Sequence, residues 1–182
     1  MGLIRLFTLI SILLLGFLPC TAAGSSESLD LDFKLPAPED GAHLDYLGLE
    51  KGQAFTPYQI SADILVIEIF SMYCPICQRE APKVNELYER LEKIQGKTIR
   101  IIGIGAGNSE YETRFFGKNY GIEFPLFSDG KFHIHKKIGE KGTPFFIGIT
   151  PSAPEGSRIF FTHSGEIKDL DAFVDRLMDA SR

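Results

Sequence analysis

The sequence predicts one α/β domain of three layers, in which helices cover both faces of a mixed central sheet. Residues 64–70 form a continuous, β-branched apolar run, which is typical of a central strand covered on both faces. Residues 75–95 then carry apolar side chains at helical spacing. Strands and helices keep alternating after that helix, and the chain closes with a strand pair and a helix, so the sheet combines parallel and antiparallel neighbours.

The composition is that of an ordinary globular protein. Of the 182 residues, 44% are hydrophobic and 24% are charged, and the formal net charge is −5. A chain of this length buries enough surface to form a core without disulfides or a structural metal. The acidic balance offers no cationic patch, which argues against nucleic acid or an anionic membrane surface as a partner.

The N-terminal stretch has the order of a secretory signal peptide. Arg5 precedes an apolar run over residues 6–18, and small residues follow. We therefore expect residues 1–23 to be a signal peptide and residues 24–28 a short polar linker. Cleavage at the end of this segment removes Cys20 and leaves two of the three cysteines in an oxidising compartment.

Two other interpretations of this stretch stay open. Cys20 could become a lipid-modified first residue, although Pro19 stands where lipoprotein signals carry a small residue. The segment could also remain as a membrane anchor, although its apolar run is short for a bilayer span. In every case the body of the protein lies outside the cytoplasm, in the periplasm or an equivalent compartment.

The first elements of the mature chain are predicted as a β-hairpin. Residues 29–35 alternate strictly between apolar and polar side chains, as in a half-buried strand. Residues 36–41 form a Pro/Gly turn, and a weaker alternation through Leu44, Tyr46 and Leu47 predicts a returning strand.

The elements after the first long helix follow from the same patterns. Runs of apolar and β-branched residues predict strands at residues 98–105, 122–127, 145–149 and 158–163. Capping residues and helical spacing predict helices at residues 109–121, 131–138 and 170–180.

The motif Cys74-Pro75-Ile76-Cys77 lies where the central strand gives way to a helix. The free N–H groups and the dipole at a helix N-terminus stabilise a thiolate by up to about 2 kcal/mol, or about 1.5 pKa units. That is enough to ionise roughly half of an ordinary thiol at neutral pH. Cys77, one turn further on, can then attack a mixed disulfide formed by Cys74.

Two structural roles compete with this redox interpretation. A permanent disulfide between the cysteines would close a loop of two residues and add little stability. A metal site would need further ligands, for which the candidates are His133, His135 and His163.

Further motifs accompany the cysteine pair. They are Phe33-Lys34-Leu35-Pro36, Asp40-Gly41, residues 70–77, Pro82 and Gly142-Thr143-Pro144. Together they resemble the thioredoxin superfamily, and more narrowly the TlpA/ResA-like extracytoplasmic thiol-disulfide oxidoreductases. The resemblance implies a thioredoxin-like three-layer domain over residues 29–182, with a mixed central sheet, an N-terminal β-hairpin and a central strand-helix insertion at residues 98–121.

The resemblance also implies roles for individual residues. Cys74 is expected to attack and Cys77 to resolve the mixed disulfide. Glu68, six residues before Cys74, falls where these proteins keep a buried acid, and burial should raise its pKa so that it can exchange a proton with Cys77. The other interpretation of Glu68 is a strand-edge carboxylate facing water.

The expected substrate-binding residues lie on both sides of the cysteines. Pro144 matches the cis-proline of the superfamily and leaves the backbone of Thr143 free to pair with an extended substrate chain. Tyr73, Pro75 and Ile76 surround the cysteines in sequence and are expected to contact the same substrate.

The resemblance implies client proteins with thiols or disulfides as partners, together with a membrane or extracytoplasmic electron donor. We expect a monomer with no metal and no cofactor beyond the Cys74–Cys77 redox-active disulfide. In the family, proline commonly stands second between the cysteines, whereas here Pro75 comes first, and Tyr73 replaces a common Trp. The direction of electron flow therefore stays open, with reduction of clients favoured over oxidation.

Two other functions remain as alternatives. A copper-binding relative or metallochaperone would use both cysteines with His163 or His135, since thiolates and imidazole suit copper. A thiol peroxidase resembles the pattern P-x-x-x-T/S-x-x-C, which Ser71 fits and Ile67 does not.

Overall fold

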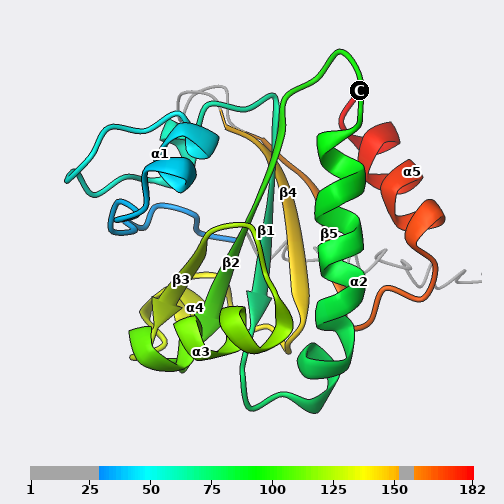
Figure 1. The fold of residues 1–182 in the computed structure, drawn as a ribbon. Helices are drawn as coiled ribbons and strands as arrows, with labels where there is room; N and C mark the ends of the chain where they lie inside the picture. The colour runs from blue at the N-terminus through cyan, green and yellow to red at the C-terminus, as the bar shows by residue number, and fades with distance from the viewer. Residues whose placement is uncertain (1–28, 152–157) are drawn as a thin grey trace, which may run out of the picture.

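The computed structural model describes residues 29–151 and 158–182 (Figure 1). The predicted signal peptide at residues 1–23 and the linker at residues 24–28 lie outside the described residues. Across the part that is described, no helix has the length and apolar character needed to cross a membrane.

A mixed sheet forms the centre of the domain, as predicted, and has five strands within the described residues. The strand order is β3-β2-β1-β4-β5, so β1 lies in the middle, parallel to β2 and antiparallel to β4. The remaining pairs are parallel for β2 and β3 and antiparallel for β4 and β5. The strands span Ile64–Phe70 (β1), Ile99–Ala106 (β2), Leu126–Asp129 (β3), Phe145–Thr150 (β4) and Arg158–Ser164 (β5).

Helices and the N-terminal segment cover the two faces of this sheet (Figure 1). On one face lie α2, α3 and α5, and on the other lie α1, α4 and residues 29–35. The helices span Gly41–Leu47 (α1), Pro75–Glu92 (α2), Glu110–Tyr120 (α3), His133–Lys137 (α4) and Leu170–Ala180 (α5), and a 3-10 turn spans Pro57–Gln59. The three-layer prediction is therefore confirmed.

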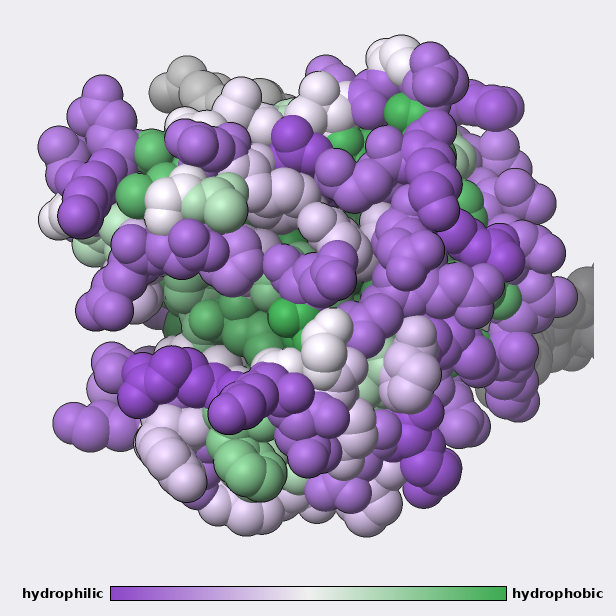
Figure 2. Space-filling view, viewed as in Figure 1, coloured by the Kyte–Doolittle hydropathy of each residue, from purple (hydrophilic) through white to green (hydrophobic). Residues whose placement is uncertain are grey.

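The central strand β1 is buried along its whole length, as its unbroken apolar run predicts. Leu65, Ile67 and Ile69 point into the core beneath α1 and α4, whereas Ile64 and Val66 point into the core beneath α2 and α5. Because side chains alternate along a strand, Glu68 lies on the α2 face. In the view of Figure 2 the surface is mainly hydrophilic. Hydrophobic residues show chiefly in a hollow between the α1 region and the region of β3 and α3 below it.

The predicted N-terminal β-hairpin is wrong. The alternation of residues 29–35 correctly marks burial, since Leu31, Phe33 and Leu35 are in the core. The backbone forms an isolated β-bridge between Leu35 and Phe55, and the Asp30 N–H donates to the Lys137 carbonyl at 3.2 Å. Packing against the sheet face therefore orders this segment without a partner strand.

The predicted returning strand is helix α1. Asp40 caps its start by accepting a hydrogen bond from the Ala42 N–H, and Gly48 ends it in the left-handed conformation at φ 64°. Leu44 and Leu47 lie three residues apart and are both buried, which is helical spacing. The turn-like Asp40-Gly41 sequence is thus a helix start.

The strand-helix unit predicted at residues 98–121 is present as β2 and α3. The strand that follows begins later than predicted, at Leu126, because Ile122 still donates to Gly117 at the end of α3. The proline at position 125 has no N–H for a strand ladder, although its carbonyl accepts from Gly103.

Candidate active site

The cysteine pair lies at the N-terminus of α2, directly after the loop that leaves β1 (Figure 1). Cys74 is the N-cap residue of this helix, with φ −83° and ψ 114°, and Pro75 takes the first helical position. Proline fits there because the first helical N–H has no partner within the helix. The backbone N–H of Cys77 points back to the Cys74 Sγ at 3.4 Å.

The surroundings of Cys74 favour its thiolate. Partial burial is the largest single influence and opposes ionisation. Hydrogen bonds from the Thr143 side chain and from the backbone and thiol of Cys77 outweigh it, so the pKa of Cys74 is lowered. The Sγ of Cys74 also lies 3.3 Å from the carbonyl oxygen of Thr143, which the protonated thiol can donate to. Cys74 is half-buried and so remains accessible to another sulfur.

Cys77 has the opposite character. Its side chain is buried, and burial raises the pKa of its thiol well above the ordinary value. The thiol hydrogen bond to Cys74 and the nearby carboxyl of Glu68 raise this pKa further. Because one thiol is activated and the other held protonated, the two cysteines are prepared for different steps.

Glu68 lies beneath the cysteine pair and is buried, with 4% of its surface exposed. The alternative of a strand-edge carboxylate facing water is therefore wrong, because β1 is the middle strand of the sheet. Burial raises the pKa of Glu68 to about 8, and repulsion from Glu80 acts in the same direction. A carboxyl with this pKa can both take up and release a proton near neutral pH.

Glu80 is a buried carboxyl that the sequence analysis missed. It lies one turn after Cys77 on α2 and is 1% exposed. Its Oε1 accepts from the backbone N–H of Ile167 at 2.8 Å and lies 3.8 Å from the Lys83 Nζ. Burial raises the pKa of Glu80, opposed by the Ile167 hydrogen bond. The available signal was a charged residue in line with the apolar face of the helix.

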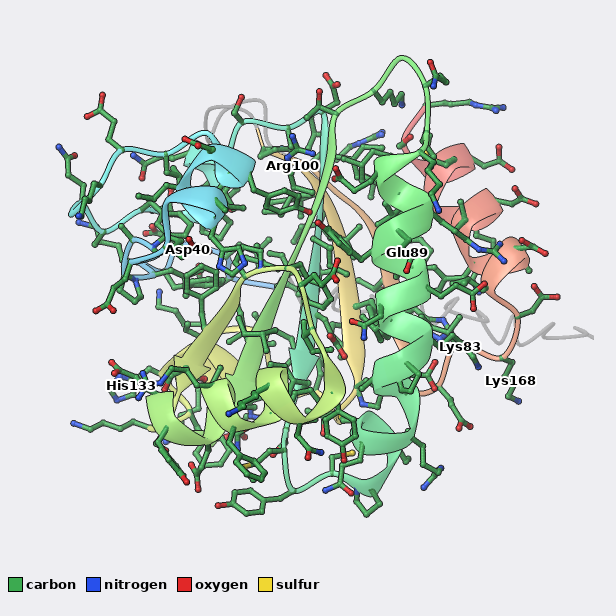
Figure 3. All side chains as sticks on the ribbon, in the orientation of Figure 1. Asp40, Lys83, Glu89, Arg100, His133 and Lys168 are labelled. Carbon is green, nitrogen blue, oxygen red and sulfur yellow. The ribbon has the colours of Figure 1, made fainter. Side chains whose placement is uncertain are left out.

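The Thr143–Pro144 peptide bond is cis, as the resemblance implies. Pro144 is buried, and its carbonyl accepts from the Gly165 N–H at 2.8 Å. The loop that contains Gly165 continues to Ile167, whose carbonyl accepts from Lys83 on α2 (Figure 3). One loop thus fixes both the proline and the helix that carries the cysteines.

The other expected substrate-binding residues surround the cysteines at the surface. Tyr73, Pro75 and Ile76 are all exposed, and Tyr73 is 65% exposed. The structure therefore brings the predicted catalytic and substrate-binding residues together at one end of α2.

The loop between β1 and Cys74 is held by side chains that the sequence analysis did not identify. The N–H of Met72 donates to the Asn108 Oδ1 at 2.8 Å, and the Met72 carbonyl accepts from the Gln78 Nε2 at 2.7 Å. Asn108 follows β2 and is completely buried. Both backbone polar groups of Met72, two residues before Cys74, are therefore fixed by neighbouring elements.

Asn108→Ala is expected to destabilise the fold by about 1–3 kcal/mol, because it removes the acceptor of the Met72 N–H. Alkylation of Cys74 by iodoacetamide, measured across pH, should also become slower, because the loop before Cys74 is no longer held in place. Ser128→Ala is the matched control, since it removes a hydrogen bond to the Asn108 carbonyl and leaves Met72 in place. If both variants alkylate at the wild-type rate, Asn108 does not position the loop.

The histidines proposed as metal ligands lie apart from the cysteines. His135 is on α4 and contacts the Lys141 carbonyl, while His163 is on β5 and contacts the Glu166 carbonyl. Within residues 29–151 and 158–182, no group of three or more potential His, Cys, Asp or Glu ligands comes together. Nothing in the described part of the chain thus supports the copper-binding alternative.

Comparison with known proteins gives relatives of one kind. The chain is 26% identical over 129 residues to the thiol-disulfide oxidoreductase ResA of Halalkalibacterium halodurans, covering 71% of this chain and 68% of that protein. It is 30% identical over 83 residues to ResA of Bacillus cereus, covering 44% of this chain and 46% of that protein. These matches confirm the ResA-like resemblance.

Solved structures confirm the fold. A secreted disulfide oxidoreductase of Mycobacterium tuberculosis matches with a TM-score of 0.58 at 16% identity, covering 82% of this chain and 96% of that one. StoA from Bacillus subtilis matches with a TM-score of 0.53 at 17% identity, covering 69% and 90%. Residues 31–169 match the AhpC/TSA family. The chain therefore belongs to the AhpC/TSA family, with a thioredoxin-like fold, and is a thiol-disulfide oxidoreductase.

Proposed function

We propose that this protein reduces disulfides in client proteins outside the cytoplasm, with Cys74 as the attacking thiol and Cys77 as the resolving thiol. The observation that carries the proposal is the contrast between the cysteines. Cys74 is accessible at a helix N-terminus with a lowered pKa, and Cys77 is buried behind it with a raised pKa.

The reaction proceeds in two exchanges. The Cys74 thiolate attacks one sulfur of a client disulfide, which forms a mixed disulfide and releases the other client sulfur as a thiolate. Cys77 then gives its proton to the Glu68 carboxylate and attacks the Cys74 sulfur. This step forms the Cys74–Cys77 disulfide and releases the second client sulfur. The client gains two electrons and this protein loses two, which an extracytoplasmic thiol donor must restore.

Glu68 suits the second exchange because it lies beneath the cysteines and its pKa is close to neutral pH. With a pKa of about 8, roughly a tenth of this carboxyl is ionised at pH 7 and ready to accept a proton. The proton it receives is released again at little cost, so the same group serves the reverse reaction. Thr143, next to Cys74 and before the cis-proline, offers its backbone to the extended client chain.

The proposed location rests on the sequence and on the related proteins. The N-terminal stretch has the order of a signal peptide, and the Mycobacterium tuberculosis protein of similar fold is described as secreted. A reductant outside the cytoplasm needs a continuous electron supply, so we propose a membrane or extracytoplasmic donor as its second partner.

A redox titration of the cysteine pair against glutathione and dithiothreitol tests the direction. The expected potential is near −270 mV, about that of thioredoxin, which favours the reduction of clients. A potential near −120 mV, about that of strong protein oxidants, would make this protein an oxidant instead. Insulin reduction should proceed in parallel, and consumption of hydrogen peroxide without insulin reduction would favour the peroxidase alternative.

A further inference from the structure

An aromatic patch lies at the surface beside the cysteines, and its two residues on α3 have no function in the reaction as described so far. We define the aromatic patch as Tyr73, Ile76, Tyr111 and Phe115. These side chains are 65%, 37%, 70% and 49% exposed, respectively. Large apolar side chains that gather on one surface mark interaction sites more often than isolated ones do.

Helix α3 brings Tyr111 and Phe115 to the active site. Its inner face contributes Phe116, which is buried in one cluster with Phe70 and Cys77. The rings of Phe70 and Phe116 stack with centroids 4.6 Å apart. The helix that carries Tyr111 and Phe115 therefore packs directly on the start of the cysteine helix.

The exposed face of α3 carries two aromatic rings beside the exposed ion pair of Glu110 and Arg114. Tyr111 and Phe115 are one helical turn apart and stack on each other with centroids 6.5 Å apart. Figure 2 shows hydrophobic surface over the α3 region, within otherwise hydrophilic surroundings. Two stacked rings offer a partner a large contact area at a small cost in side-chain entropy.

A hydrogen-bonded bridge connects the two halves of the patch. The Tyr73 hydroxyl donates to the Glu112 Oε1, and the Glu112 Oε2 accepts from the N–H of Ser109 at 2.7 Å and from its hydroxyl at 2.8 Å. Both carboxylate oxygens are satisfied by the protein, so a partner can cover this charge at a small desolvation cost. The bridge also holds Tyr73 in place before a partner binds.

The size of the patch favours a polypeptide segment over a folded protein or a second copy. Four side chains with these exposures offer on the order of 400 Å². A stable protein–protein interface needs about 800 Å² from each partner. One or two apolar side chains of an extended chain, already placed at the active site by its cysteine, match the smaller area.

From this arrangement we infer that the aromatic patch binds an aromatic or large aliphatic side chain of the client, close in sequence to its reactive cysteine. Axes of packed helices lie about 8–10 Å apart, and an extended chain covers about 3.4 Å per residue. The bound side chain is therefore about three residues from the cysteine. The inference rests on the proposed function and adds a substrate class to it, namely extended segments with an apolar residue beside the disulfide.

The test measures kcat/KM for five disulfides with the wild type and with the double variant Tyr111→Ser/Phe115→Ser. Four are peptide disulfides, each with either Phe or Ser at a position three residues before or three residues after the cysteine. The fifth is a small aromatic disulfide without a polypeptide chain. Ile159→Ser is the matched control, because Ile159 is an exposed apolar residue on β5 with 37% of its surface exposed.

The wild type is expected to reduce a Phe peptide about tenfold faster than its Ser counterpart, through a lower KM. The double variant should lose this preference and keep its rates on the Ser peptides and the small disulfide, while Ile159→Ser should behave as the wild type. Equal rates of the wild type on Phe and Ser peptides, or a preference that survives in the double variant, would overturn the inference. Light scattering could instead show that the wild type and Ile159→Ser are dimers and that the double variant is a monomer. That result would assign the patch to a second copy of the chain and would also overturn the inference. If the wild type reduces none of the five disulfides, the proposed function itself fails.

Discussion

Cys77→Ser is expected to accumulate covalent complexes with client proteins, whereas Cys74→Ser is expected to lose turnover by several orders of magnitude and form no complexes. The reason is the division between an accessible thiol with a lowered pKa and a buried thiol with a raised pKa. Without the buried thiol, the mixed disulfide on Cys74 has no internal attacker and persists. Non-reducing electrophoresis of the variants after incubation with a disulfide-containing client measures the outcome.

The double variant Cys74→Ser/Cys77→Ser provides the control for complexes that form by other routes. Wild-type rates of insulin reduction by Cys77→Ser would contradict the resolving role. Complexes trapped by Cys74→Ser instead would exchange the two roles, which the burial of Cys77 argues against.

Glu68→Gln is expected to remove most of the pH dependence of stability between about pH 4.5 and pH 8. The pKa of Glu68 is raised from an ordinary value of 4.5 to about 8, mainly by burial, so the folded protein holds a proton that the unfolded chain releases. The stability of the wild type is therefore full below pH 4.5 and falls as the pH rises through 8, by on the order of 4 kcal/mol. Urea midpoints across this range, for the wild type and the variant, measure the difference.

Glu89→Gln on α2 is the control, because its carboxyl is exposed and pairs with Lys93 (Figure 3). This variant should retain the wild-type pH dependence. Glu80 is buried too, and burial raises its pKa, so a smaller dependence of the same sign should remain in Glu68→Gln. Parallel profiles for wild type and Glu68→Gln would contradict a buried, proton-holding Glu68.

The same variant separates the chemical role of Glu68 from its effect on stability. Release of the client from the mixed disulfide should slow by about 100-fold, because the amide cannot accept the proton of Cys77. Formation of the mixed disulfide by Cys74 should be unchanged, since that step starts from an existing thiolate. Stopped-flow measurement of the two steps distinguishes them.

The local sequence determined the parts of the protein that depend on neighbours along the chain. The β-branched run of residues 64–70 was enough to place the central strand, whereas the burial of Glu68 was decided by the position of β1 in the middle of the sheet. The Cys74-Pro75-Ile76-Cys77 motif was enough to place one cysteine at the helix cap and the other a turn inside. Both are consequences of backbone periodicity and capping, which act over a few residues.

The prediction of an N-terminal hairpin was wrong because its local sequence patterns are each compatible with two structures. Alternating apolar residues mark an extended segment with one buried side, whether or not another strand pairs with it. Asp40-Gly41 can likewise start a turn or cap a helix. In this protein residues 29–35 pack on the sheet face and α4 instead of pairing with a strand. The helix after Asp40 goes with the burial of Leu44 and Leu47, which lie three positions apart.

Tertiary structure alone decided which distant residues support the site. Asn108 reaches Met72 across 36 positions, Glu80 meets Ile167 across 87, and α3 carries Tyr111 and Phe115 to the cysteines. No periodicity in the sequence encodes these contacts, because they depend on how the sheet orders its strands and on which helix faces pack together. The sequence by itself identified the two cysteines as the candidate reactive pair and Glu68 as a candidate acid. The packing of the layers specified what holds their loop in place and what surface they present to a client.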